Sequence, residues 1–173
     1  MPNPVHDIAS KALGTVKATK ARLEGLHGVF RKLAQEHGEA SALLMRLKHS
    51  KDPALRRELF PRIRQELLAH EKSELQVVFP ILREHTDTQQ IAADHHQDAL
   101  ELEQLIDQLS HMSTDDAAWQ TTFDSLVDRV QQHVHEEESD FFPTAQRVLG
   151  DGVADALLPR YEAAKRELWP QLS

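Results

Sequence analysis

The chain has 173 residues, of which 40% are hydrophobic, and its 28 acidic and 20 basic residues give a formal net charge of −8 at pH 7. The acidic excess disfavours nucleic acid and anionic membranes as partners, and the absence of cysteine excludes disulfides, thiolate metal ligands and thiol nucleophiles. The length suits one compact domain over residues 1–173, since single cores of roughly 100 to 200 residues are usual; without a basic leader and an apolar run, we expect a cytoplasmic protein.

Apolar residues recur every three or four positions along nearly the whole chain, and no stretch alternates as a half-buried strand would. The pattern predicts an all-α fold. An extra N-terminal helix is expected over residues 4–24, with Asn3 as its cap and Pro4 at its first position. The core over residues 26–149 should contain four helices, which run from Leu26 to Lys48, from Pro53 towards Glu84, from about Thr86 through Leu109 and from Ala117 to Leu149. A short helical tail over residues 151–170, broken at Pro159, should pack outside.

An internal repeat relates the two helical hairpins of this core. In each half, the first helix carries an acidic residue followed by histidine, and the second carries His-x3-Glu-x4-Phe-Pro. The residues are Glu36-His37, His70, Glu74 and Phe79-Pro80 in the first half, and Asp94-His95, His133, Glu137 and Phe142-Pro143 in the second. Two equivalent hairpins predict an up-down four-helix bundle. The Phe-Pro pairs are expected to kink their helices and to carry no chemistry.

The spacing of these polar residues predicts a metal site inside the bundle. Residues four apart lie on one face of a helix, so each His-x3-Glu pair can reach the same point. Four imidazoles and two carboxylates left unpaired in a core would be costly, and a shared metal satisfies them together. Imidazole and carboxylate suit iron, manganese or zinc, and two octahedral ions would keep positions for a bridging oxygen and an exogenous ligand. The predicted ligands are His37, His70, Glu74, His95, His133 and Glu137.

These motifs resemble the hemerythrin-like domains, also called HHE cation-binding domains, over about residues 26–149. Every position of the family's acidic-His and His-x3-Glu pattern is filled. The resemblance implies a non-heme centre of two iron ions, with zinc or manganese as possible substitutes. It also implies a protein that binds oxygen, responds to nitric oxide or oxidative stress, or senses iron and oxygen. Ala99 stands where the invertebrate oxygen carriers place a further histidine, which disfavours oxygen carriage and indicates the bacterial four-histidine group.

Some assignments have alternatives. His95 aligns with Leu102 and Leu105 on the inner face, but the adjacent His96 could replace it as the ligand on this helix. His27 is a remote candidate for covering the cavity. A metal-free alternative is that Glu74 and Glu137 pair with buried, protonated histidines. The remaining histidines are interpreted as surface or ordinary core residues: His6, His49, His85, His111 and His135.

Two functions fit these residues. The first is a protein that binds or senses a small oxidant or diatomic, namely oxygen, nitric oxide or peroxide. The second is an oxidoreductase that turns over nitric oxide or peroxide. The sequence contains no flavin or nicotinamide fingerprint and no appended catalytic domain, which favours the first. A third reading is a helical interaction module in which the metal is purely structural. The protein partner and the oligomeric state stay open.

Overall fold

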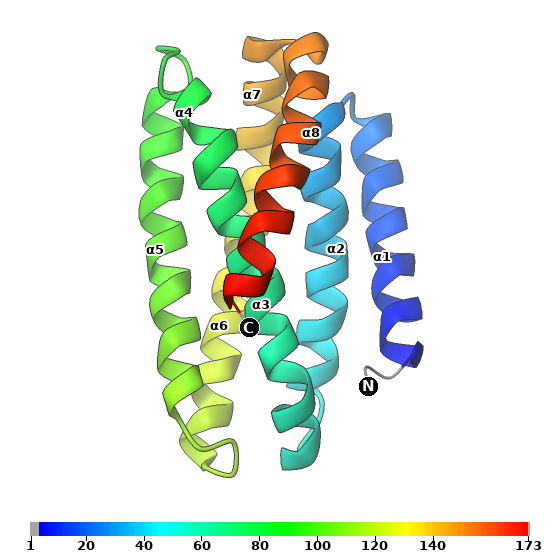
Figure 1. Cartoon of the computed structure of the whole chain (residues 1–173), viewed down its shortest axis with the longest axis vertical. Helices are drawn as coiled ribbons and strands as arrows, with labels where there is room; N and C mark the ends of the chain where they lie inside the picture. Colours follow the sequence, from blue (N-terminus) through cyan, green and yellow to red (C-terminus); the bar gives the residue numbers. More distant parts are fainter. Residues whose placement is uncertain (1–3, 173) are drawn as a thin grey trace.

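The computed structural model describes residues 4–172, and these residues form helices and turns with no β-strand (Figure 1). The all-α prediction is therefore confirmed. The helices are α1 (Pro4–Leu23), α2 (Gly28–Lys48), α3 (Pro53–Val77), α4 (Phe79–Leu82), α5 (Gln89–His111), α6 (Ala117–Glu136), a π-helical turn (Glu137–Phe141), α7 (Phe142–Leu149), α8 (Asp151–Leu168) and a final 3₁₀ turn (Trp169–Leu172).

Helices α2, α3, α5 and α6 form an up-down bundle in which successive helices run in opposite directions (Figure 1). The starts of α3 and α6 are fixed by aspartate caps. The side chain of Asp52 accepts a hydrogen bond from the Ala54 amide, and that of Asp116 accepts one from the Ala118 amide. Asn3, the expected cap of the N-terminal helix, lies outside the described residues.

The two Phe-Pro pairs interrupt the helices that carry them. Helix α3 ends at Val77 and the short α4 begins at Phe79, so the helix expected to reach Glu84 is broken. In the second half, the π-helical turn Glu137–Phe141 stands between α6 and α7. A proline clashes with the carbonyl four residues before it, and a wider turn relieves that clash. The break therefore falls beside a predicted ligand in both halves.

The N-terminal helix α1 lies outside the bundle along α2 (Figure 1). Its close approach depends on Gly14 and Gly38, since a Cβ on Gly38 would lie 2.7 Å from the Leu13 carbonyl oxygen and 2.9 Å from the Gly14 Cα. No side chain fits between two backbones at that separation. The contact therefore holds α1 at one register against α2.

The C-terminal segment differs from its prediction in one respect. Helix α8 runs unbroken from Asp151 to Leu168 and passes through Pro159, which is exposed. The proline removes one helical hydrogen bond, but burial of the neighbouring apolar side chains outweighs that loss. Leu157 and Tyr161 bury one face of α8 against the bundle, and the helix packs on α2 and α3. The helix therefore packs on the outside of the bundle, as expected, and its buried face belongs to the core.

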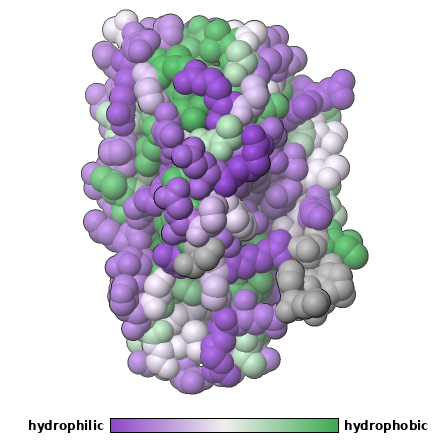
Figure 2. Space-filling model, in the orientation of Figure 1, coloured by the Kyte–Doolittle hydropathy of each residue, from purple (hydrophilic) through white to green (hydrophobic). Residues whose placement is uncertain are grey.

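Two apolar clusters fill the interior, one above and one below the predicted ligands along the helix axes. One contains Phe30, Phe79 and Tyr161, and the other contains Phe60, Trp119 and Phe123. The face seen in Figure 2 is mostly hydrophilic, with apolar side chains scattered between polar ones. None of the helices in residues 4–172 combines the length and the apolar character needed to cross a bilayer.

Candidate metal centre

The predicted ligands converge at mid-height in the bundle and form two groups that share one carboxylate. His37, His70 and Glu137 form the first ligand group, and His95, His133 and Glu137 form the second. Within each group one ligand atom per residue lies within 4.8 Å of the others, and all five side chains are buried. Glu137 opens the π-helical turn, which places its carboxylate between the two groups. Two cations could therefore be bridged through Glu137.

Glu74, the sixth predicted ligand, lies beside the first group. One of its carboxylate oxygens is 3.7 Å from Nε2 of His70, and the residue is 1% exposed. Neither oxygen of Glu74 or of Glu137 accepts a well-aligned hydrogen bond from the described residues, and Nε2 of His37, His70 and His133 makes none either. Nε2 of His37 and Nε2 of His133 nevertheless lie 3.0 and 3.3 Å from Glu137. Burying a lone pair without a hydrogen-bond donor costs free energy. Metal ions that prefer nitrogen and oxygen ligands would satisfy all of these atoms together. The residues present thus fit a pair of metal ions.

Without a cation, the cluster balances its charge through protons. Burial raises the pKa of Glu74 well above its usual value, and the carboxylates of Glu137 and Glu71 raise it further. Burial would also raise the pKa of Glu137, but His133 and His37 outweigh it and hold that pKa well below its usual value. For His133, burial opposes the charge, yet Glu137 and Glu71 raise its pKa well above the usual value. Bound cations would take the place of these protons.

Glu71 is a site residue that the sequence analysis missed. It is 6% exposed, and its carboxylate lies 3.2 Å from Nε2 of His133, the same nitrogen that lies 3.3 Å from Glu137. Because Glu71 follows His70 directly, it is turned by about 100° around α3 and reaches the second group while His70 serves the first. A signal was present in the sequence, since Glu71 and Glu74 lie three apart on the same helix.

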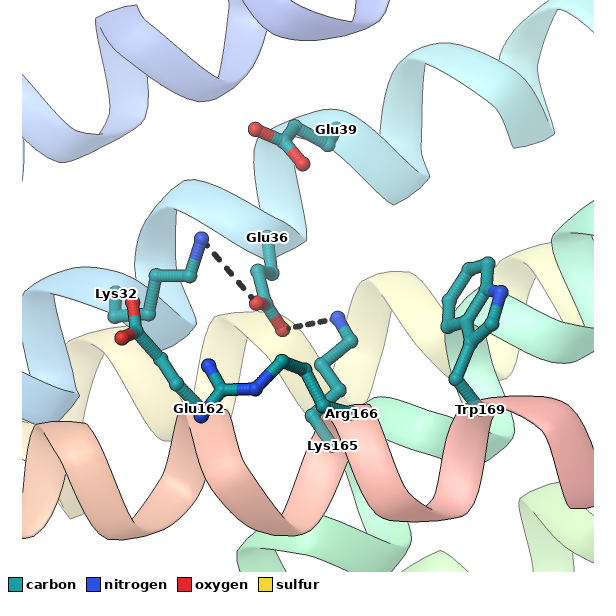
Figure 3. Close-up of a pocket in the computed structure, with 7 residues that line it drawn as sticks. All are labelled: Lys32, Glu36, Glu39, Glu162, Lys165, Arg166 and Trp169. Carbon is teal, nitrogen blue, oxygen red and sulfur yellow. Dashed lines mark hydrogen bonds and ion pairs between the residues drawn. The ribbon is translucent and has the colours of Figure 1, made fainter.

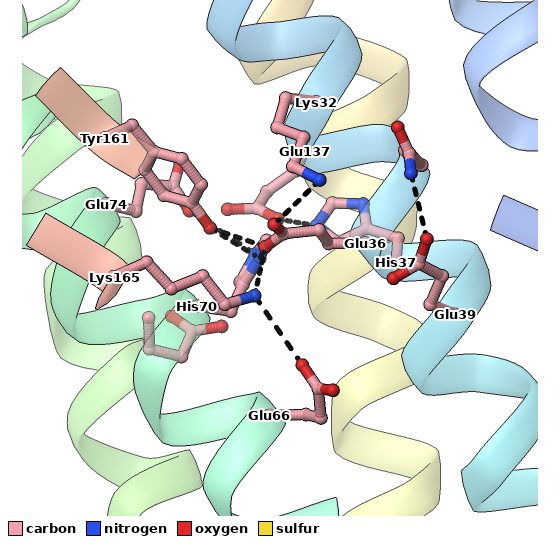
Figure 4. Close-up of polar contacts among 12 residues, drawn as sticks. Lys32, Glu36, His37, Glu39, Glu66, His70, Glu74, Glu137, Tyr161 and Lys165 are labelled. Carbon is pink, nitrogen blue, oxygen red and sulfur yellow. Dashed lines mark hydrogen bonds and ion pairs between the residues drawn. The ribbon is translucent and has the colours of Figure 1, made fainter. Parts of the chain in front are cut away.

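Glu36 fixes the orientation of His70. The Nδ1 atom of His70 lies 3.0 Å from a Glu36 oxygen that also accepts a hydrogen bond of 2.6 Å from the Tyr161 hydroxyl (Figure 4). Lys165 donates to the same oxygen at 2.7 Å, and Lys32 lies 3.5 Å from the other oxygen (Figure 3). With Nδ1 as the donor to this carboxylate, Nε2 of His70 is left free to face a cation.

These contacts keep Glu36 ionised. Burial would raise the pKa of Glu36, but the hydrogen bond from His70 and the charge of Lys165 lower it far below its usual value. Tyr161 responds in the opposite way, because burial and the nearby Glu36 carboxylate raise the pKa of its phenol well above the usual value. A neutral phenol therefore donates to a charged carboxylate, the stronger of the possible hydrogen bonds between them.

His37 has an equivalent outer partner from another element. Its Nδ1 lies 3.0 Å from Glu138, which accepts a hydrogen bond of 2.6 Å from Lys17 of α1. Its Nε2 lies 3.0 Å from the Glu137 carboxylate. Burial opposes a charge on His37, but Glu137 and Glu138 raise the pKa of its imidazole to about 9. Both imidazoles of the first group are thus held by outer carboxylates, and the flanking helices α1 and α8 hold those carboxylates.

The second group is held differently. The His95 ring stacks on Phe141 at 4.6 Å, and the His133 ring lies edge-on to His95 at 5.4 Å. Nδ1 of both histidines lacks a hydrogen-bond partner among residues 4–172. The aligned acidic residue Asp94 is exposed and accepts a hydrogen bond from Gln90. No carboxylate holds Nδ1 of either imidazole among these residues, and ring packing supports that side of both rings instead.

The remaining histidines lie away from this cluster. His96 is half-buried and belongs to neither group, so the structure brings His95 into the centre as the sequence favoured. Nε2 of His27 lies 3.7 Å from Asp151 near the start of α8, and its side chain is half-exposed, so it does not cover the cavity. The side chain of His6 falls outside the described part of the chain. The others are exposed, as expected: His49, His85, His111 and His135.

Comparison with known proteins agrees with this geometry. A family model described as the hemerythrin HHE cation-binding domain matches residues 18–145. A curated protein from Nostoc sp. (strain PCC 7120), named as a DNA nickase, is 26% identical over 143 residues. That alignment covers 81% of this chain and 40% of the Nostoc protein, so this chain corresponds to less than half of its relative. No solved structure gives a significant match.

Proposed function

The chain belongs to the hemerythrin HHE cation-binding domain family, and on this premise we propose that it binds two iron ions and uses them to bind or sense a small oxidant or diatomic. The ligands would be His37, His70 and Glu74 for one ion, His95 and His133 for the other, and Glu137 between them. The observation that supports this most is the convergence of buried imidazole and carboxylate atoms without hydrogen-bond partners among the described residues.

The iron pair would supply redox chemistry and coordination positions open to a small ligand. The chain's own residues supply the rest. Glu36 and Glu138 orient two imidazoles, and Phe141 and Phe142 cover His95 and His37 with apolar rings. Glu71 is a further candidate ligand of the second ion. The proposed ligand is oxygen, nitric oxide or peroxide, in a stress response or an iron or oxygen response.

The first test is the metal content of the purified protein, combined with its near-ultraviolet and visible absorption. We expect about two irons per chain, with absorption bands that disappear on reduction and return with oxygen or peroxide. Stable zinc, or a folded protein without metal, would contradict the proposal. Zinc and manganese are tested in the same way, as substitutes that should bind to the same residues.

Two alternatives are separated by further measurements. A di-iron oxidoreductase would consume nitric oxide or peroxide over many turnovers, whereas a binding or sensing protein would react about once per centre. A purely structural metal would show no exchangeable ligand, and its removal would unfold the bundle. Glu74→Ala tests the assignment itself, because retained iron in this variant would show that Glu74 is not a ligand.

We propose that the protein has no nucleic-acid or membrane partner and that it is located in the cytoplasm. The net charge of −8 supports the first statement, because nucleic-acid binding relies on clustered basic residues. The name of the Nostoc relative refers to a protein of which this chain spans 40%, so it gives no reason to assign DNA cleavage here. A filter-binding titration with nicked and intact DNA would test this, and tight binding at physiological salt would contradict it.

A further inference from the structure

A small internal cavity adjoins the metal ligands on the side that faces α8. Its volume is about 20 Å³, somewhat more than the roughly 10 to 15 Å³ that a single water needs. Three imidazoles line it, namely those of His37, His70 and His133, so it borders both ligand groups. The rest of its wall combines apolar side chains with Lys165 and the carboxylates of Glu36, Glu66 and Glu71. A cavity at this place is where a small exogenous ligand would meet the cations.

A much larger pocket opens on the surface directly outside this cavity. Its volume is about 480 Å³, and charged side chains of α2 and α8 line it together with an aromatic ring (Figure 3). The lining residues are Lys32, Glu36, Glu39, Glu162, Lys165, Arg166 and Trp169. Glu36 and Lys165 line both spaces, so these two side chains form the partition between the surface pocket and the cavity.

Lys165 is the member of this partition with the longer and more flexible side chain. Its ammonium group lies 2.7 Å from Glu36 and 3.6 Å from Glu66, which ties α8 to α2 and α3 across the opening (Figure 4). Glu36 is fixed by His70 and Tyr161 as well, but Lys165 is held only through the end of a flexible four-carbon stem. Its side chain is 16% exposed, so rotation towards the surface pocket needs no movement of the backbone.

We propose that Lys165 is a gate, through which small ligands pass from the surface pocket into the cavity beside the metal centre. The inference rests on the proposed function, and it adds the route by which the ligand enters and the size of ligand that can pass. A ligand larger than about two or three heavy atoms does not fit a space of 20 Å³, so diatomics and hydrogen peroxide would pass and bulky peroxides would not. Lys165 acts here as a positioning residue, because it controls access without contacting the ions.

The test measures the rate at which azide binds to and leaves the oxidised, iron-loaded protein, followed by visible absorption. Lys165→Ala is expected to raise both the association and the dissociation rate at least tenfold. The affinity should stay within about twofold, because a gate changes both directions equally. Lys165→Met keeps most of the stem but loses both ion pairs, and it should raise both rates as well. Unchanged rates in both variants would overturn the gate.

Arg166→Ala is the matched control, because Arg166 lines the surface pocket beside Lys165 but does not line the cavity. It should leave both azide rates unchanged, and an equal acceleration in this variant would overturn the assignment to Lys165. Iron content and thermal unfolding are measured for each variant. A wild-type protein without iron would contradict the proposed function itself, whereas iron-loaded variants with unaltered azide rates would contradict only the gate.

The size limit is tested with two peroxides of different bulk, hydrogen peroxide and tert-butyl hydroperoxide, acting on the reduced, iron-loaded protein. The quantity compared is the ratio of their oxidation rates in each variant, which cancels their different intrinsic reactivity. Lys165→Ala should lower the ratio of the hydrogen peroxide rate to the tert-butyl hydroperoxide rate at least threefold relative to the wild type. Arg166→Ala should not change this ratio. An identical ratio in all three proteins would overturn the size filter.

Discussion

The two ligand groups come from similar sequence patterns, yet their surroundings differ. In the first group, Glu36 is buried and binds Nδ1 of His70, whereas in the second the aligned Asp94 is exposed. The same contrast appears beside Glu137, where Glu138 holds His37 but no residue among 4–172 holds Nδ1 of His133. The repeated sequence pattern thus determines which residues face the centre, whereas the helices packed outside the bundle determine the partners of those residues.

The difference follows from the position of the two flanking helices. Helix α1 brings Lys17 to Glu138, and α8 brings Tyr161 and Lys165 to Glu36, and both helices cover the α2 side of the bundle. On the α5 side, Phe141 stacks on His95 in place of such contacts. The first group is therefore oriented by charge and hydrogen bonds, while packing orients the second. Four predictions test this comparison.

The largest effect is expected for the residue that both groups share. Glu137→Ala removes the carboxylate that belongs to both groups, so both cations should be lost and iron should fall from about two per chain to less than one. Metal analysis of the purified variant measures this. Glu136→Ala is the control, because Glu136 is half-buried and accepts a hydrogen bond from Gln132 outside the centre. Loss of one ion alone would show that Glu137 serves a single group.

The pH should act on both groups alike. Glu137 and Glu138 raise the pKa of His37 from 6.5 to about 9, and the pKa of His133 is also raised. In the metal-free protein, the stability gained from protonated His37 is fully present below pH 6.5 and is lost as the pH rises through about 9. Metal binding displaces such protons, so zinc affinity should increase by about tenfold per pH unit for each proton within this window.

Zinc titration and urea unfolding between pH 6.5 and 9 measure these two trends. We expect the affinity for zinc to increase and the free energy of unfolding of the metal-free protein to decrease over the same range. A flat affinity would show that the imidazoles are already neutral before metal binds, and it would contradict the ion pairs between His37 and its two carboxylates.

Substitution of an outer carboxylate should weaken metal binding only in the ligand group that this carboxylate orients. Glu36→Gln removes the charge that orients His70, and such changes typically lower metal affinity about 10- to 100-fold. We expect this loss at one of the two zinc sites in a calorimetric titration. The aligned substitution Asp94→Asn should leave both sites unchanged, since Asp94 is exposed. Equal losses from both substitutions would contradict the asymmetry.

The smallest effect is expected for Tyr161→Phe. The variant deletes a buried hydrogen bond of 2.6 Å to Glu36, but Lys165 and His70 still bind that carboxylate. The free energy of unfolding should fall by about 1 to 2 kcal/mol, while the iron content stays near two per chain. Urea unfolding of the metal-free protein measures the first quantity. An unchanged unfolding energy would show that the phenol adds nothing to the Glu36 network.

The sequence was sufficient to predict most of the helices and the inward-facing side chains of the candidate centre. Helical periodicity places His133 and Glu137 on one face, and that relation depends only on local geometry. The outer partners were beyond such reasoning, because Tyr161 and Lys165 lie 125 and 129 residues from Glu36 along the chain. Pro159 also suggested a broken tail there, since the burial that keeps α8 helical depends on its packing against α2 and α3.

The acidic-His repeat shows the same limit of prediction from the sequence. Glu36 and Asp94 occupy equivalent positions, so the sequence treated them alike, and only packing against α8 buries one of them. Glu71 was missed for a different reason, because it lies outside the His-x3-Glu spacing and reaches the second group by a rotation around α3. Local patterns predict which face a residue occupies, but a site built from five helical segments and supported by α1 and α8 also depends on contacts between distant segments.

The π-helical turn also makes the site sensitive to chain length. A π turn accommodates one residue more than an α turn, and here it lets the consecutive Phe141 and Phe142 cover different histidines, His95 and His37. Deleting one residue from 138–140 would restore α-helical phase and rotate α7 by about 100° relative to Glu137. The spacing is therefore as much a part of the centre as the ligands: insertions and deletions here would dismantle it even where every substitution is tolerated.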